Sequence, residues 1–135
     1  MDAEKCRALK DSLAAAGDDP IVSIERFFDG NDDAASIGCN LDPHPGMSAF
    51  RSALLGLVAR PDVTAVHARI AEVDPGDEYW PFCDTVFVVG TLSLGELQRA
   101  VTGLDPTTVA DGTEFAIPDA IKALHPGPVL AVFWD

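Results

Sequence analysis

The chain is predicted to fold as an α+β protein with a ferredoxin-like core. From residue 36 onward, the apolar patterns follow the order strand, helix, strand, strand, helix, strand. This βαββαβ order predicts a four-stranded antiparallel sheet with two helices on one face, in which the first and third strands lie parallel at the centre. An additional helix precedes this core. At 135 residues, the chain has the length of a single domain.

The first part of the chain contains a helix, an ambiguous segment and a strand. Apolar residues at spacings of three and four predict a helix over residues 3–16, which Gly17 ends. Residues 21–28 fit either a strand or a short helix. Alternation of apolar and polar residues over 36–41 predicts a half-buried strand, with Cys39 on its buried side.

The rest of the chain continues the alternation of helices and strands. Ser93 and Glu96 form the capping box of one helix. Two prolines and a glycine make residues 74–83 a long loop. We expect residues 1–19 to form the N-terminal helix and a linker, and residues 20–135 to form one α+β domain. The other expected elements are helices over 47–60, 93–104 and 118–124, and strands over 63–73, 85–90 and 128–134.

Charge and composition exclude several classes of protein. The chain has 22 acidic and 9 basic residues, for a net charge of −13. Because binding to nucleic acid requires a basic face, a nucleic-acid partner is excluded, and an anionic membrane surface is disfavoured for the same reason. No run approaches about 18 consecutive apolar residues, so no membrane span is predicted. Three cysteines without metal-type spacing, and no secretory signal, predict a cytoplasmic protein with free thiols.

Acidic residues gather in two stretches that lack any cation. No Lys or Arg lies between Arg26 and Arg51 or between Arg69 and Arg99, and these gaps hold four and six acids respectively. The predicted topology places both stretches, together with the C-terminus, at one edge of the sheet. Carboxylates there would steer a basic protein partner, and aromatic side chains would anchor it. The expected partner-binding residues are Asp29, Asp32, Asp33, Asp77, Glu78, Tyr79, Trp80 and Trp134.

The same acidic end has a second interpretation, a site for a cation in a small cation-dependent enzyme or metal-binding protein. Asp29, Asn31 and Asp33 have the alternate spacing of half a calcium loop. An EF-hand is rejected, because Ala34 stands where the motif needs Gly and Asn40 where it needs Glu. We therefore assign no metal ligand and no cofactor. A third alternative is a homodimer through the exposed face of the sheet.

The sequence offers no catalytic residue, and whether the protein is an enzyme is left open, with the balance towards a binding protein. It contains no nucleophile elbow, no Walker loop and no dinucleotide-binding glycine motif. His44, His67 and His125 are expected to be unrelated surface or capping residues. If a ligand set existed, Cys39, Cys83 and His67 would be its best candidates.

Four segments resemble a family of small acidic bacterial proteins of unassigned function. They are FFDGNDD at 27–33, SIGCNL at 36–41, ARPDV at 59–63 and WPFCDTV at 80–86. The resemblance covers about residues 20–110 and implies no catalytic residue. Some small acidic bacterial proteins of this kind resemble immunity proteins that neutralise toxins, which is an analogy in charge and size. Together these observations predict a non-enzymatic cytosolic binding module for a basic protein.

Overall fold

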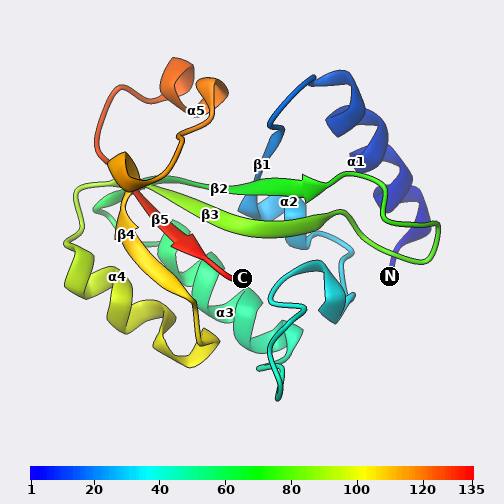
Figure 1. The fold of residues 1–135 in the computed structure, drawn as a ribbon, viewed down its shortest axis with the longest axis horizontal. Coiled ribbons are helices and arrows are strands. Elements are labelled where there is room, and N and C mark those ends of the chain that lie inside the picture. The colour runs from blue at the N-terminus through cyan, green and yellow to red at the C-terminus, as the bar shows by residue number, and fades with distance from the viewer.

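The computed structural model describes residues 1–135 and contains one five-stranded sheet (Figure 1). The strand order is β1-β2-β3-β5-β4, and every neighbouring pair is antiparallel. The strands are β1 (Ile21–Ser23), β2 (Val63–Glu72), β3 (Phe82–Gly90), β4 (Thr108–Asp111) and β5 (Val129–Phe133). The helices are α1 (Ala3–Ala15), α2 (Ile24–Phe28), α3 (Met47–Val58), α4 (Leu94–Val101) and α5 (Asp119–Leu124). None of these helices has the length and apolar character needed to cross a membrane.

The main core lies on the face of the sheet that α3 and α4 cover (Figure 1). Along β3, Val86 and Val88 point into this core, where they meet Phe50 and Leu54 of α3 and Leu97 of α4. Each of these side chains is fully buried. The predicted helices over 47–60 and 93–104 are thereby confirmed, the second as α4 followed by a 3₁₀ turn. The capping box of Ser93 and Glu96 is present.

The opposite face of the sheet is covered over part of its area by residues 112–128, which include α5 (Figure 1). Phe87 and Val89, which alternate with the core residues of β3, pack here against the fully buried Ile121 of α5. Phe115 and Ile117 border this smaller cluster. Residues 112–128 therefore cover part of the sheet face that we expected to be exposed. A homodimer through this face stays a prediction.

The ambiguous segment 21–28 contains both of the structures that its pattern allowed. β1 pairs with β2, and α2 begins directly afterwards, with Ser23 as its N-cap. The predicted N-terminal helix is confirmed as α1. Leu9 and Leu13 of this helix belong to the same core as the sheet and α3. The proposed division between an N-terminal element and a domain is not tested by this packing.

The strand predicted over 36–41 is wrong. Asp33 caps a 3₁₀ turn at Ala34–Ser36, and Ile37 makes a single isolated bridge to Cys83. Gly38 then adopts a positive φ of 65°, and a side chain there would collide with the ring of Phe50. This turn breaks the alternation, so Cys39 is exposed rather than buried.

A ferredoxin-like four-stranded sandwich is not confirmed. In that fold, the strand predicted over 36–41 would pair with β3 in parallel. Only the single bridge from Ile37 remains of this pairing, and β5 lies next to β3 instead. The sequence pattern also missed β4, a four-residue strand at the edge of the sheet, in which Ala110 is the only buried residue. The coarser prediction, a mixed α+β fold around an antiparallel sheet, is confirmed.

Candidate functional site

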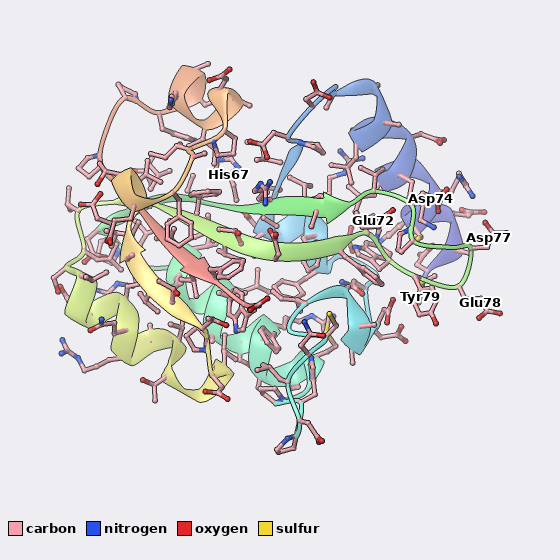
Figure 2. The ribbon with its side chains drawn as sticks, in the orientation of Figure 1. His67, Glu72, Asp74, Asp77, Glu78 and Tyr79 are labelled. Carbon is pink, nitrogen blue, oxygen red and sulfur yellow. The ribbon has the colours of Figure 1, made fainter.

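The acidic residues of the predicted site lie around the loop that joins β2 to β3. This loop, residues 73–81, projects beyond the sheet beside α1 (Figure 2). The segment 29–36 lies against it, because the backbone N–H of Trp80 donates a hydrogen bond to Asp33 at 2.9 Å. The structure therefore brings parts of the two acidic stretches together, although Asp33 and Trp80 are 47 residues apart in sequence. The backbone of Trp134 lies beside the second stretch, because its N–H donates to the carbonyl of Asp84 at 3.0 Å, while its ring packs against Phe50 of α3.

Cations of α1, together with the α-amino group that precedes it, pair with several of these carboxylates. Lys10 reaches into the loop, with Nζ 3.0 Å from Asp74 and 2.8 Å from the carbonyl oxygen of Gly76. Lys5 pairs with Asp29 at 2.7 Å, and the α-amino group of Met1 pairs with Asp32 at 2.9 Å. These contacts lower the pKa of Asp74 and of Asp32 and raise the pKa of Lys5, chiefly through the hydrogen bonds within each pair. The N-terminal helix is thus an internal counterion for the acidic loops.

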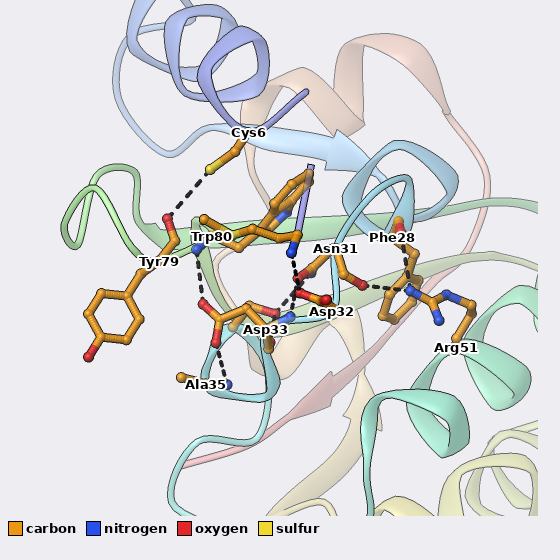
Figure 3. A network of polar contacts seen from close by, with 11 residues as sticks. Cys6, Phe28, Asn31, Asp32, Asp33, Ala35, Arg51, Tyr79 and Trp80 are labelled. Carbon is orange, nitrogen blue, oxygen red and sulfur yellow. Dashed lines mark hydrogen bonds and ion pairs between the residues drawn. The ribbon is translucent and has the colours of Figure 1, made fainter. Parts of the chain in front are cut away.

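Asp33 has a structural role in this arrangement (Figure 3). One carboxylate oxygen accepts from the Trp80 N–H, and the other accepts from the N–H of Ala35 at 3.0 Å. The carboxylate therefore caps the 3₁₀ turn and fixes the end of the β2–β3 loop at the same time. Cys6 of α1 adds a weak Sγ contact to the carbonyl of Tyr79 at 3.5 Å.

A buried amide holds the other acidic segment (Figure 3). Asn31 is 1% exposed, and its side chain donates to Ser36 Oγ at 3.0 Å and accepts from the N–H of Asp33 at 2.9 Å. Arg51 of α3 donates to the carbonyl of Asn31 at 2.6 Å and lies over the ring of Phe28. Because each polar group in this cluster has a partner, the segment is held rigidly rather than available as a set of free ligands.

The two tryptophans do not provide surface for a partner. Trp80 is fully buried and Trp134 is 4% exposed. The indole of Trp134 donates to the carbonyl of Leu104 at 3.0 Å, whereas the Trp80 indole N–H has no partner. The expectation that both would be exposed anchors is corrected. Their sequence neighbours are acidic, but their large apolar rings are buried in the core.

Four exposed side chains, one at the end of β2 and three on the β2–β3 loop, form what we call the acidic tip: Glu72, Asp77, Glu78 and Tyr79 (Figure 2). The Asp77 side chain is 95% exposed, and its nearest cation, Arg7, lies at 3.8 Å. Tyr79 is 43% exposed and packs edge-on against Phe82. The tip thus combines highly exposed carboxylates, of which Asp77 has only the long contact with Arg7, with an aromatic ring that packs on Phe82. Glu72 was absent from the predicted set, although it lies in the same cation-free stretch.

The structure brings together no three His, Cys, Asp or Glu side chains in an arrangement that could hold a metal ion. The alternative ligand set of Cys39, Cys83 and His67 does not form such a cluster. Cys83 is buried, and burial raises the pKa of its thiol well above the ordinary range, with the Asp84 carboxylate adding to this effect. The interpretation of the acidic end as a cation site gains no geometric support from these positions.

One contact between distant residues could not be found from the sequence. The Nε2 atoms of His67 on β2 and His125 after α5 lie 3.0 Å apart. Fifty-eight residues separate the two histidines, and neither belongs to a recognisable motif. Only the folding of residues 112–128 over the second face of the sheet brings them together.

These features define a small acidic α+β protein with a rigid, negatively charged loop at one end of an antiparallel sheet. A family model described as the uncharacterized protein YfbO family matches residues 4–131, and the chain belongs to that family. It is 30% identical over 121 residues to "Uncharacterized protein YfbO" of Escherichia coli (strain K12), which covers 86% of this chain and 83% of that protein. No solved structure matches the chain.

Proposed function

We propose that this protein is a non-enzymatic binding module whose acidic tip engages a basic protein partner. The observation that carries the proposal is the contrast between two carboxylates of one loop. Asp74 is closely paired with the buried Lys10 at 3.0 Å, whereas Asp77, 95% exposed, has only a long, solvent-exposed ion pair with Arg7 at 3.8 Å. Because an exposed ion pair contributes little, the Asp77 carboxylate is available to a cation of a partner.

The tip has the two properties that protein recognition uses. Its carboxylates, in a chain of net charge −13, attract a basic surface over long range and increase the association rate. Tyr79 offers an aromatic ring of the type enriched at interface hot spots and able to face a Lys or Arg side chain. Four fixed points limit the conformational entropy lost on binding: the Lys10 contacts, the Cys6 contact, the Asp33 bond and the Phe82 packing.

The immunity-type resemblance gives a finer form of the same proposal. An immunity protein neutralises a toxin by covering it, and an acidic surface suits a toxin whose own surface is basic. In this form, the partner is a basic bacterial toxin and the acidic tip is the contact surface. The support is charge complementarity and the exposed tip alone.

Capture experiments with charge-reversed variants test the proposal. Immobilised wild type, Asp77→Lys/Glu78→Lys and Glu114→Lys/Asp119→Lys are incubated with lysate of the native host at low and moderate salt. The last variant is a matched control, because it reverses two exposed acids far from the tip. We expect one basic protein to be retained by the wild type and the control, lost from the tip variant and released by salt. Equal retention by all three proteins, or retention of no basic protein, would contradict the proposal.

A further inference from the structure

Residues 113–127, which cross the second face of the sheet, have very few polar connections to the rest of the chain. Their backbone hydrogen bonds, such as Ile121 to Pro118 and His125 to Ile121, stay within the segment, apart from the one from Phe115 to the adjacent Gly112. Thr113 donates to Asp111 at the start of the segment, and no ion pair involves it. The contact between His125 and His67 is the one hydrogen bond that ties residues 113–127 to a distant element.

The geometry of the two rings is that of a shared proton. Their Nε2 atoms are 3.0 Å apart and their centroids 5.2 Å apart, so the two nitrogens face each other along the line between the rings. One nitrogen donates its N–H and the other accepts with its lone pair. A metal ion needs about 2.0–2.1 Å to each nitrogen, so none fits on that line.

The bond tolerates one additional proton but not two. When one imidazole is protonated at its other nitrogen, a charge-assisted N–H···N bond replaces the neutral one. When both rings are protonated, both Nε2 atoms carry hydrogens, the acceptor is lost and two positive charges face each other. Because the second proton must enter beside an existing positive charge, the pair takes it up only at a lower pH than the first.

The surroundings of His67 oppose its protonation on balance. Burial and the neighbouring His125 lower its pKa, while the carboxylate of Glu25, from α2, acts in the opposite direction. Its register partners on the adjacent strands, Ser23 and Phe87, carry no charge. Among the other charges, Arg69 on the same strand is paired with Asp19 and Asp84, and Asp119 and Lys122 of α5 are exposed.

We propose that residues 113–127 form a lid over the second face of the sheet, latched by the His67–His125 hydrogen bond and released when both imidazoles are protonated. The lid ends before Pro128, whose carbonyl is held by the N–H of Gly90 on β3 at 3.2 Å. Beneath the lid lie Phe87 and Val89, which pack with the buried Ile121. Opening, which becomes more frequent in acid, therefore exposes an apolar patch on the sheet. This device is independent of the acidic tip, which lies at the opposite end of the sheet (Figure 2).

Hydrogen exchange measured by mass spectrometry tests the latch on the intact chain. Peptides from 112–128 are followed at about pH 7.5 and 5.0, with exposure times corrected for the intrinsic exchange rate. We expect protection of the lid to fall by about three- to tenfold at the lower pH, as the loss of one hydrogen bond implies, while peptides of α3 keep theirs. Unchanged protection of the lid, or an equal loss in α3, would overturn the proposal.

Two variants separate the latch from general acid sensitivity. His125→Gln supplies a side chain that does not titrate, so the protection of the lid should no longer depend on pH. His44→Gln is the matched control, because this histidine lies outside the lid and contacts the carbonyl of Ile37. A pH response that survives in His125→Gln would contradict the latch. If that variant folds poorly, NMR titration of the wild type decides: the ring protons of His67 and His125 should shift together with the lid methyl signals, and independent titration would refute the latch.

Discussion

Lys10 of α1 inserts its ammonium group into the β2–β3 loop and lies 3.0 Å from the carboxylate of Asp74. The side chain of Lys10 is 4% exposed, whereas that of Asp74 is 52% exposed, so the loop closes over the cation. A second bond, to the carbonyl of Gly76, fixes the turn that presents the acidic tip. The N-terminal helix therefore takes part in shaping the candidate site.

Removal of this cation should destabilise the protein measurably. Lys10→Met retains an apolar stem of similar length but loses both bonds, and we expect a loss of about 1–3 kcal/mol in the free energy of unfolding. Urea denaturation followed by tryptophan fluorescence measures the change. Lys5→Met is the matched control, because its pair with Asp29 is largely exposed and should matter little. Similar urea midpoints for the two variants would show that Lys10 is not a structural anchor.

Asp33 should be far more important for stability than the neighbouring Asp32. Asp33→Ala removes the acceptor for both Trp80 N–H and Ala35 N–H, and we expect a loss of about 2 kcal/mol. Asp33→Asn retains one acceptor oxygen and should lose less. Asp32→Ala removes an exposed carboxylate and should leave the thermal midpoint nearly unchanged. If the two alanine variants melt at the same temperature, the capping role of Asp33 is wrong.

The His67 imidazole predicts a specific pH dependence of stability. Burial and His125 lower the pKa of His67 in the folded state. Between this folded-state pKa and about pH 6.5, where an unperturbed histidine titrates, the unfolded chain therefore binds more protons than the folded chain. Its contribution to stability is therefore complete above about pH 6.5 and is lost as the pH falls through the lower, folded pKa. His67→Gln should flatten this part of the curve of unfolding free energy against pH. A variant curve parallel to that of the wild type would refute the assignment.

The three free cysteines should differ sharply in reactivity. Cys39 is exposed, whereas Cys6 and Cys83 are buried, and burial raises the pKa of both buried thiols. Because the thiolate is the reactive form, one thiol per folded chain should react rapidly with Ellman's reagent. Cys39→Ser should abolish this fast phase. Rapid labelling of two or three thiols in the native protein would contradict the burial of Cys6 and Cys83.

Local signals explain why most of the elements could be predicted. The capping box at Ser93 and Glu96 and the spacing of apolar residues in α1 and α3 depend on neighbours within a few positions. The prediction of a strand at 36–41 failed because Gly38 turns the chain, and the ring of Phe50, which leaves no room for a side chain at that position, lies outside the segment. The sequence did not predict β4, because its four residues show no strand pattern of their own. Its pairing with β5, which the sequence does not reveal, makes it a strand.

The sequence predicted the negative charge of the candidate site but not which of its carboxylates are paired within the protein. The gaps in Lys and Arg along the sequence indicated the acidic stretches, and the structure places both beside α1. Three-dimensional packing decides which carboxylates stay free: Lys10 pairs with Asp74, and Asp33 is used as a cap. The burial of Trp80 also depends on three-dimensional packing. Its polar neighbours in sequence gave no indication that its ring packs in the core.

The association rate of the captured basic partner is the most direct test of the central claim. The rate constant is measured by stopped flow for the wild type, for Asp77→Lys/Glu78→Lys and for the control Glu114→Lys/Asp119→Lys, over an ionic strength of about 0.05–0.3 M. We expect the tip variant to associate at least about tenfold more slowly at low salt and to depend less on salt, while the control follows the wild type. Equal rates and equal salt slopes for the wild type and the tip variant would contradict the proposal that the acidic tip recognises the partner.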